Sequence, residues 1–507
     1  MFDLGRSFLA SAERSPQAIA IIDGCQRLNY SEWHAEICRV VDGLMAQGLH
    51  KGDRLAIVLQ NRLAMATVHW ACQFAGIVVT PLNWRLKAEE LDYCLMNAEA
   101  RAIIFEEVSA AAVAGSDVAA RLPRIGVGAA SGATFQYETF GNARRQYSPR
   151  AAPDDFSLLL YTSGTTGPPK GVPRRHRAER AAALAHIAQN LYGFGERTLG
   201  VMPLYHTMGV RSLLAMTLID GAFICLPRFE AAEAIRLIER EQATNLYLVP
   251  TLYHDLLGHA DFTPEKMRSV SKLAFAGAPM AEGLLRRVEA AFQPELFVNH
   301  YGSSEVYTFT INQHATQKPG SAGRAGLNQR VRVIRLAAES PEELAEIGEE
   351  GQIIADLSSD EAFEGYWRRP DAGARALREG WYFTGDTGFI DRDGDLFVTG
   401  RVDDMIITGG ENVSPAEVEN VLSLHPAVAE CAVAGLPHER LGHRVTAFVK
   451  RAVEIDTASL DTWCRASSLA DYKRPRDWVF VAEIPKSPVG KVLRRKLIAG
   501  EFERDAE

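Results

Sequence analysis

Long apolar runs are missing from this sequence of 507 residues. Its most apolar stretches, such as residues 213–226, are interrupted (here by Asp220 and Gly221) and are too short to span a bilayer. Charged residues also break the first 15 positions before a signal sequence could form. We therefore expect a cytoplasmic protein with no membrane partner.

Excess positive charge is also missing. The sequence has 55 Lys and Arg against 64 Asp and Glu, a formal net charge of −9, whereas proteins that bind nucleic acids carry a basic surface. The seven cysteines are odd in number and form no C-x-x-C pair, which is typical of thiols in a reducing compartment. These absences exclude a nucleic-acid partner and a disulfide framework from our expectations.

What is present is an alternation of short apolar strands and helical patterns. It runs through residues 17–150, beginning with a strand at 18–22, and resumes after residue 178 up to 300. Such alternation predicts an α/β fold with two doubly wound sheets covered on both faces. Residues 326–400 predict a small β-rich lobe, and the last hundred residues predict a small α+β domain. The polar run at 400–404 marks the expected boundary between domains 1–402 and 403–507.

One stretch, residues 158–172, has a composition suited to a polyanion. Its glycines let backbone N–H groups approach phosphate oxygens, its hydroxyls donate further hydrogen bonds, and Lys170 supplies a positive charge. The spacing is not that of a Walker A motif, since the residue five positions after Gly164 is Pro169. Composition alone leaves two readings open, a different phosphate loop or a hydrophilic turn.

Three further segments carry chemistry. Residues 299–305, Asn-His-Tyr-Gly-Ser-Ser-Glu, follow a predicted strand and place an aromatic ring, hydroxyls and a carboxylate at a sheet rim, where open α/β sheets bind ligands. Asp386, in Trp-Tyr-Phe-Thr-Gly-Asp, and Arg401 are suited to ribose hydroxyls and phosphate. Lys491 lies beside a glycine just before a basic helix, where a lysine is usually only solvated.

In this order, the four segments resemble the motifs of the adenylate-forming enzymes, which include acyl- and aryl-CoA ligases, luciferases and adenylation domains. The resemblance covers nearly the whole chain and is strongest to the 4-chlorobenzoate, benzoate and hydroxycinnamate CoA ligases. It implies that the enzyme uses ATP, Mg²⁺ and coenzyme A. It also implies that the small C-terminal α+β domain is mobile, with a hinge at Asp403. The implied catalytic residues are Lys491, Glu305, Ser304 and His206, and Glu305 would also hold the metal. The implied ATP and AMP contacts are Thr162, Ser163, Gly164, Thr165, Thr166, Gly167, Lys170, Tyr301, Gly302, Ser304, Asp386 and Arg401.

The same resemblance implies an acyl site and a coenzyme A site. The acyl site would comprise Ala185, His206, Thr207, Met208, Tyr247, Ala276, Gly277, Tyr307 and Thr308, and the coenzyme A site Arg85, Gly409, Gly410, Tyr472 and Arg474. Because most of the acyl-site residues are apolar or aromatic, we expect a flat aromatic acid. Arg211, just beyond them, is also suited to a second carboxylate.

Several alternatives stay open. An enzyme that loads a carrier protein would share every nucleotide motif, and a ligase for medium-chain or dicarboxylic acids would share the coenzyme A contacts too. A non-catalytic AMP-binding regulator should lack the lysine or the hinge, and this chain has both. The sequence leaves the oligomeric state open, with a homodimer as one option.

Overall fold

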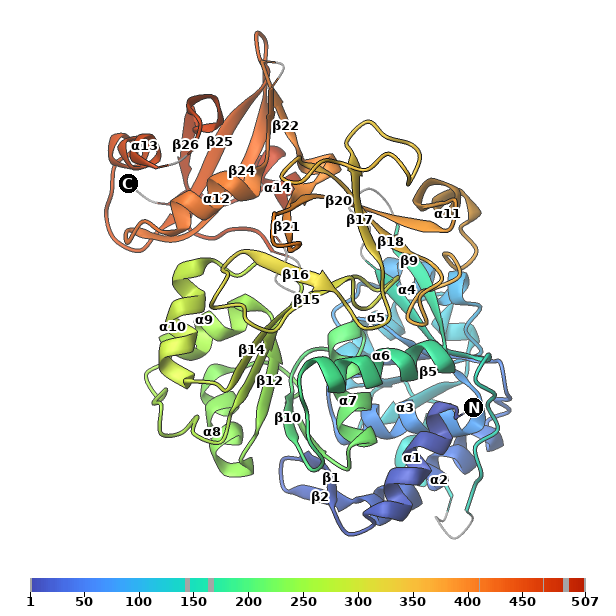
Figure 1. The fold of residues 1–507 in the computed structure, drawn as a ribbon. Helices are drawn as coiled ribbons and strands as arrows, with labels where there is room; N and C mark the ends of the chain where they lie inside the picture. The colour runs from blue at the N-terminus through green and yellow to red at the C-terminus, as the bar shows by residue number, and fades with distance from the viewer. Residues whose placement is uncertain are drawn as a thin grey trace.

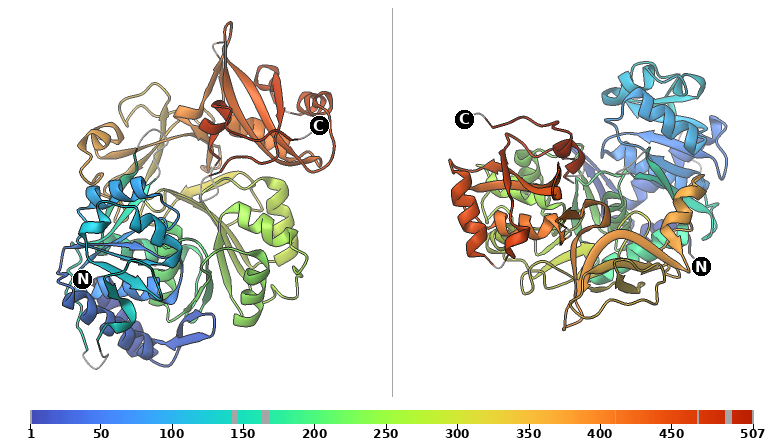
Figure 2. Two further views of the ribbon diagram at one scale, coloured as in Figure 1. Left: turned by 180° about the vertical axis from the view of Figure 1, so that it is seen from behind. Right: turned by 90° about the horizontal axis from the view of Figure 1, so that it is seen from above.

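The computed structural model describes residues 2–141, 146–162, 168–409, 411–467, 469–486 and 492–505, and their strands form three sheets (Figure 1). No helix in these ranges is long and apolar enough to cross a membrane. Figure 2 shows, from above, that the C-terminal sheet and the N-terminal seven-stranded sheet lie on opposite sides of the molecule.

The seven-stranded sheet contains the first half of the predicted alternation. Its strands, in spatial order, are β7 (Phe135–Gln136), β6 (Arg124–Val127), β5 (Ala102–Glu106), β3 (Arg54–Val58), β4 (Val78–Pro81), β8 (Phe156–Thr162) and β9 (Lys170–Arg175). All pairs are parallel except β8 with β9, which form an antiparallel hairpin. The sheet packs with α3 (Leu63–Ala75), α4 (Ala88–Ala98) and α5 (Glu107–Ala114). Strands β3, β4 and β5 are apolar because they are buried on both faces.

The second sheet has 14 strands and runs through most of the molecule. Its order is β17 (Val331–Arg335), β18 (Gly351–Asp356), β20 (Trp381–Ile390), β21 (Leu396–Arg401), β16 (Ser321–Ala325), β15 (Thr310–Asn312), β14 (Leu296–Tyr301), β13 (Lys272–Phe275), β12 (Asn245–Leu248), β10 (Arg197–Gly200), β11 (Ala222–Cys225), β1 (Ile19–Asp23) and β2 (Gln26–Asn29), with β19 (Leu377–Arg378) beside β20. The strands predicted as a β-rich lobe therefore continue the second doubly wound sheet.

One strand assignment from the sequence was wrong. The strand predicted at 18–22 was expected in the first half, but β1 pairs in parallel with β11, so that Ile21 lies opposite Phe223. Its apolar residues are buried in the second sheet, where β2 satisfies the backbone groups on one edge of β1 and the distant β11 satisfies those on the other. The connected helices are α1 (Leu4–Arg14) and α2 (Tyr30–Ala46).

The remaining helices of the large part are α6 (His176–Gln189), α7 (Thr207–Leu218), α8 (Ala231–Glu241), α9 (Pro250–Gly258), α10 (Glu282–Phe292) and α11 (Pro370–Ala376). Strands β10, β12, β13 and β14 are parallel neighbours. Their carboxyl ends therefore lie at one edge of the sheet, and the segments that follow them carry most of the predicted acyl-site residues.

The smaller C-terminal sheet has five strands, β22 (Ile406–Thr408), β23 (Glu411–Val413), β24 (Val428–His438), β25 (Gly442–Arg451) and β26 (Asp477–Phe480). Helices α12 (Pro415–Ser423), α13 (Thr457–Ala466) and α14 (Arg494–Ile498) accompany it. As predicted, Ser414 is the N-cap of α12 and Pro415 its first residue, where the missing N–H costs no hydrogen bond. A single 3₁₀ turn, Val402–Asp404, connects β21 of the large sheet to β22.

Candidate active site

The predicted phosphate loop is closed by the β8–β9 hairpin. Thr162 and Lys170 are directly paired in this hairpin, and the Thr162 hydroxyl donates to the Lys170 carbonyl at 3.4 Å. Ser163, Gly164, Thr165, Thr166 and Gly167 lie outside the described residues. Because Thr162 and Lys170 are paired, the segment between these two residues begins and ends at one point. A loop around an anion needs this arrangement.

The Lys170 ammonium lies 4.4 Å from the centre of the Tyr366 ring. Burial lowers the pKa of Lys170, and the nearby Glu305 carboxylate opposes that effect. Tyr366 also donates its hydroxyl to Glu305 Oε1 at 2.7 Å. Lys170 and Glu305, which are 135 positions apart in the sequence, therefore meet around one tyrosine, a residue that the motifs did not predict.

The turn after β14 is held by close backbone packing. A Cβ atom on Gly302 would lie 1.9 Å from the Tyr307 carbonyl oxygen, so only glycine fits there. The Ser303 hydroxyl accepts the N–H groups of Glu305 and Val306, which fixes the turn that leads to the carboxylate. Ser304 is half-buried beside them.

Glu305 is suited to a magnesium ion that arrives with a nucleotide. Its carboxylate is buried at 6% exposure and offers hard oxygen ligands. The described residues contain no group of three or more metal-binding side chains. Mg²⁺ commonly binds through one or two carboxylates together with substrate phosphates, so a lone carboxylate fits a phosphate-borne metal.

The predicted ribose residues Asp386 and Arg401 come together with Tyr301, another of the predicted nucleotide contacts. The Tyr301 hydroxyl donates to Asp386 Oδ2 at 2.6 Å, and Arg401 Nη1 lies 3.1 Å from Asp386 Oδ1. Asp386 and Arg401 are opposite each other on β20 and β21. A carboxylate held between a phenol and a guanidinium is oriented to accept hydrogen bonds from a diol.

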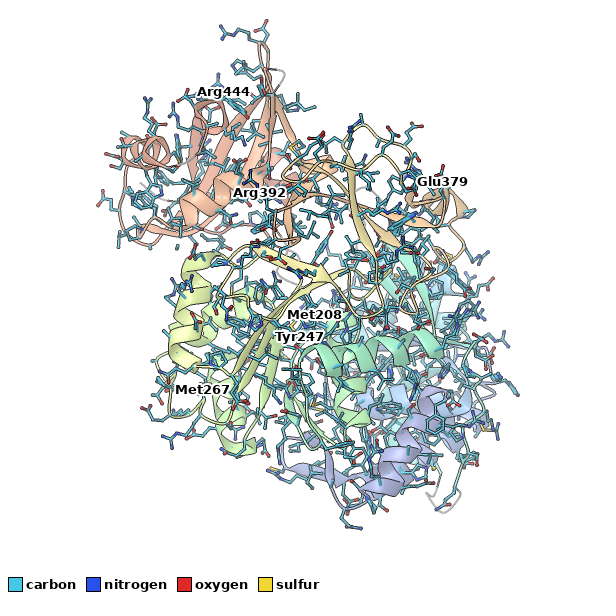
Figure 3. The ribbon with its side chains drawn as sticks, in the orientation of Figure 1. Met208, Tyr247, Met267, Glu379, Arg392 and Arg444 are labelled. Atoms are coloured by element: carbon cyan, nitrogen blue, oxygen red, sulfur yellow. The ribbon has the colours of Figure 1, made fainter. Side chains whose placement is uncertain are left out.

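The predicted acyl residues follow the strand ends as expected. Tyr247 lies near the end of β12, Ala276 and Gly277 follow β13, and His206 is the N-cap of α7. Gly277 has φ +84°, and a Cβ atom there would lie 3.8 Å from Met208 Sδ. Met208 and Tyr247 belong to one buried hydrophobic cluster, and Figure 3 labels both near the middle of the molecule.

Two histidines that the sequence analysis missed complete an aromatic cluster. The rings of His186, Tyr247 and His300 have centres 4.8–5.2 Å apart. Burial lowers the pKa of both histidines well below the usual value, so they are neutral at pH 7. His186 directly follows the predicted Ala185, which was the only signal of its position.

A buried charged cluster surrounds Tyr307, and motif comparison missed most of it. Arg174 Nε donates to Glu179 Oε1 at 2.8 Å, and the Tyr307 hydroxyl donates to Glu179 Oε2 at 2.9 Å. The guanidinium carbons of Arg174 and Arg211 lie 4.1 and 4.8 Å from the Tyr307 ring centre. The sequence contained a signal of this cluster. Arg174 lies two positions after Val172 and so on the same face of a buried strand, where arginine is unusual.

The predicted coenzyme A residues are spread over two parts of the chain. Arg85 is exposed and packs 3.8 Å from the Trp84 ring centre, and Tyr472 is exposed on a 3₁₀ turn. Arg474 is buried and forms ion pairs with Asp461 and Asp471, so its charge is already balanced. Gly409 has φ +60°, while Gly410 and Lys491 lie outside the described residues, as does the side chain of Asp403.

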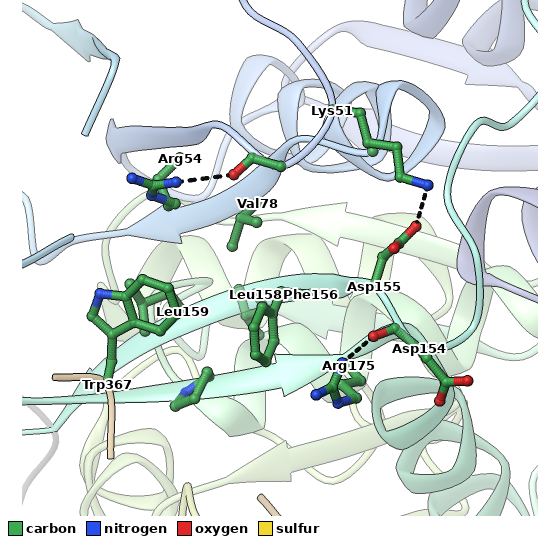
Figure 4. A pocket seen from close by; sticks show the side chains of 13 residues that line it. Lys51, Arg54, Val78, Asp154, Asp155, Phe156, Leu158, Leu159, Arg175 and Trp367 are labelled. Carbon is green, nitrogen blue, oxygen red and sulfur yellow. Dashed lines mark hydrogen bonds and ion pairs between the residues drawn. The ribbon is translucent and has the colours of Figure 1, made fainter. Parts of the chain in front are cut away.

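A pocket of about 210 Å³ lies away from all these residues (Figure 4). It adjoins the amino ends of β3, β4 and β8, whereas the phosphate loop follows the carboxyl end of β8. Its cations are already paired: Lys51 lies 2.6 Å from Asp155, and Arg175 lies 2.5 Å from Glu364. We therefore assign the nucleotide chemistry to the other edge of the sheet.

Residues 8–367 match the family model for the AMP-binding enzyme, and residues 417–491 match that for the AMP-binding enzyme C-terminal domain. The chain belongs to the AMP-binding enzyme family. It is 36% identical over 495 residues to a 4-chlorobenzoate–CoA ligase of an Arthrobacter species, covering 96% of this chain and 93% of the relative. It is 34% identical over 500 residues to a feruloyl-CoA synthase of an Amycolatopsis species, covering 97% of each.

Solved structures agree with this membership. ATP-bound MatB from Rhodopseudomonas palustris superposes with a TM-score of 0.88 at 28% identity, covering 98% of this chain and 99% of MatB. As an AMP-binding enzyme, the chain is an acid–thiol ligase of the AMP-forming class, which uses ATP, Mg²⁺ and coenzyme A.

Proposed function

We propose that the acid activated by this AMP-forming ligase is aromatic, of the benzoate or hydroxycinnamate type. The observation that carries the proposal is the ring cluster of His186, Tyr247 and His300 beside Met208 and Gly277. Flat aromatic surfaces of this kind pack favourably against a flat ring. Two relatives, named for 4-chlorobenzoate and feruloyl-CoA, support the same class.

The first half-reaction joins the acid to the nucleotide. A carboxylate oxygen attacks the α-phosphorus of ATP, the bond to the bridging oxygen breaks, and acyl-adenylate and pyrophosphate form. The loop closed by Thr162 and Lys170 holds the phosphates, and Ser304 contacts the α-phosphate. Lys491 would offset the charge that builds as two anions approach each other. Mg²⁺ held by Glu305 would neutralise part of the phosphate charge.

The second half-reaction forms the thioester. The coenzyme A sulfur attacks the acyl carbonyl and AMP leaves. We propose that domain 403–507 moves about Asp403 between the two steps. This movement would withdraw Lys491 and let the thiol enter past Gly409 and Gly410. Arg85, Tyr472 and Arg474 would contact the coenzyme A nucleotide, and His206 would position the acyl group.

A pyrophosphate-release screen tests the proposal. About two dozen aromatic and aliphatic acids would be supplied with Mg·ATP, with and without coenzyme A. We expect release with aryl acids and thioester only when coenzyme A is present. Release with fatty acids or malonate but not with aryl acids would refute the aromatic assignment.

Replacing Lys491 separates the half-reactions. We expect K491A to lower adenylation by roughly 10²–10³-fold, the usual effect of losing an electrostatic contact to a transition state. The same variant should convert supplied acyl-adenylate to thioester at the wild-type rate. Unchanged overall activity would contradict the role given to Lys491.

The rival functions predict other outcomes. A carrier-loading enzyme would transfer the acyl group to a phosphopantetheinyl protein in preference to free coenzyme A, and a regulator would bind AMP without releasing pyrophosphate. The cytoplasmic location, the absence of membrane and nucleic-acid partners and the open option of a homodimer remain predictions from composition. Size-exclusion chromatography with light scattering would determine the oligomeric state.

A further inference from the structure

Arg211 is a buried cation without a hydrogen-bonded counterion in the described chain. Its side chain is 2% exposed, and its Nε and Nη1 atoms have no hydrogen-bond partner there. The neighbouring Arg174, by contrast, is bonded to Glu179 and to the carbonyls of Glu305 and Glu361. An unpaired buried charge is costly, so the site is arranged for a partner that the chain itself does not supply.

The position of Arg211 places it at the acyl site. It follows Thr207 by four residues and Met208 by three on α7, which puts the three side chains on one helix face. Its guanidinium carbon lies 4.8 Å from the Tyr307 ring centre. Its charge also reaches His186, His300 and Tyr247, where it opposes protonation of the histidines after burial has already lowered their pKa.

Glu361 is the nearest candidate for an internal counterion, but its oxygens are engaged elsewhere. Oε2 accepts the Thr308 N–H at 3.1 Å and Oε1 accepts Asn328 Nδ2 at 3.3 Å. Burial raises the pKa of Glu361, which favours its neutral form, while Arg211 and Arg174 oppose the rise. Glu361 therefore tunes the field at Arg211 without forming an ion pair with it.

The other unpaired polar atoms here are mostly donors. His186 Nδ1 lies 3.0 Å from Asn190 Nδ2 and acts as the acceptor, which leaves the proton on His186 Nε2, an atom with no partner. Arg174 Nη2 and Gln189 Nε2 also lack acceptors in the described chain. Gln189 lies against Thr308, since a Cβ atom on Gly326 would lie 2.9 Å from both side chains. A surplus of buried donors calls for a ligand rich in acceptors.

We propose that the acid substrate carries a second carboxylate and that Arg211 binds it as the specificity-determining residue of the acyl site. A carboxylate accepts two hydrogen bonds from the guanidinium and balances its charge in a buried site. The inference rests on the acid-activating step of the proposed function, because it concerns the acid that the same site activates. A preferred aliphatic dicarboxylic acid would support the inference while refuting the aromatic assignment. It adds that a dicarboxylic acid, with its second carboxylate on a ring or on a chain, is preferred over the matched monocarboxylic acid.

Matched pairs of acids test the inference by pyrophosphate release. The aromatic arm compares benzoate with its ortho, meta and para dicarboxylic analogues and cinnamate with 4-carboxycinnamate. The aliphatic arm compares butyrate with succinate, glutarate and adipate. We expect at least one dicarboxylic acid to exceed its partner by roughly 10- to 100-fold in kcat/KM, the factor that charge-assisted hydrogen bonds provide. The arm in which the preferred dicarboxylic acid occurs shows whether the substrate is aromatic or aliphatic.

Variants at Arg211 assign the preference. R211M should lose the advantage of the dicarboxylic acid while changing kcat/KM for the monocarboxylic acid less than about threefold, and R211K should retain part of it as a point charge. R236M, at an exposed arginine paired with Glu233, is the control and should behave as wild type. E361Q keeps the shape of the neutral carboxyl group and excludes its ionised form, so it should preserve or increase the preference. Thermal unfolding shows whether each variant is folded. If R211M does not fold, R211K is compared with wild type in its place.

Two outcomes overturn the inference in different ways. If monocarboxylic aryl acids are the better substrates and R211M leaves the ratio unchanged, ordered water satisfies Arg211 and the proposed function stands alone. If no acid of either arm releases pyrophosphate from ATP, the proposed function and the inference fall together.

Discussion

Asp386 and Arg401 occupy directly opposed positions of β20 and β21, and their charged atoms Oδ1 and Nη1 lie 3.1 Å apart. The register of two antiparallel strands thus sets the geometry of this pair, and Tyr301 reaches the second carboxylate oxygen from β14, in the same sheet. The ribose side of the proposed site is consequently as rigid as the sheet.

Replacing Asp386 with Asn should weaken ATP binding. The amide keeps the shape but loses the charge that orients Tyr301 and Arg401, and hydrogen bonds to charged groups contribute about 1.5–3 kcal/mol. We expect the KM for ATP in pyrophosphate release to rise roughly 10- to 100-fold. D371N, at an exposed aspartate beside Arg369, is the control. An unchanged KM for ATP in D386N would remove Asp386 from the nucleotide site.

Replacing Tyr366 with Phe should act through Glu305. The change removes the hydroxyl that donates to Glu305 Oε1 but keeps the ring beside Lys170. Because a hydrogen bond to a charged group contributes about 1.5–3 kcal/mol, the Mg²⁺ concentration at half-maximal rate should rise roughly 10- to 100-fold. Y137F, which removes a hydroxyl bonded to the distant Glu36, is the matched control. If both variants respond alike to Mg²⁺, Tyr366 does not position the carboxylate.

Gly302→Ala should disturb the turn before Glu305. Its Cβ atom would meet the Tyr307 carbonyl, which is backbone and has no rotamer to escape into. Overpacking of this kind costs about 1–3 kcal/mol, and the turn must shift, so adenylation should fall along with stability. In Gly283→Ala, at the second position of α10, the new Cβ atom meets nothing within 4 Å, so stability should stay near that of wild type. Denaturant unfolding compares the two, and equal stability would contradict the steric account.

Stability should fall in mild acid because of His176. Burial lowers the pKa of this histidine from 6.5 to about 4, and its Nδ1 accepts the Leu4 N–H at the start of α1. A folded-state pKa below the unfolded value means that the unfolded chain binds the proton first. The contribution of neutral His176 to the free energy of unfolding is therefore complete above pH 6.5. It is lost as the pH falls from 6.5 towards 4, and the loss over that window is about 3 kcal/mol.

The variant H176N tests this dependence. Asparagine keeps an acceptor for the Leu4 N–H but does not titrate, so its free energy of unfolding should change less between pH 7 and pH 4 than that of wild type. H254N, at an exposed histidine, should keep the wild-type slope. Identical slopes in all three proteins would mean that other groups dominate the acid transition.

The sequence predicted those parts of the site that depend on local chemistry. The strand ends before the loop at Thr162 and at Tyr301 could be predicted because glycine, hydroxyl and apolar residues impose their local structure, whereas the return strand from Lys170 was not predicted. That Asp386 meets Tyr301 could be expected only from the family resemblance. An arginine at position 174 of an apolar strand was a signal of a buried charge, but its partners Glu179 and Glu361 could not be predicted, since Glu361 lies 187 positions away. The sheet to which the strand at 18–22 belongs was predicted wrongly for the same reason, since β1 pairs with the distant β11.

The pairing of β1 with β11 also sets an order of events during synthesis. Strand β1 can pair with β11 only after Phe223 has been synthesised, about 200 residues after Ile21. At roughly 5–20 residues per second on the ribosome, that wait lasts about 10–40 s. During that time the apolar strand β1 is outside the exit tunnel with β2 on one edge and its other edge unpaired, a form that chaperones bind and that aggregates when they are scarce.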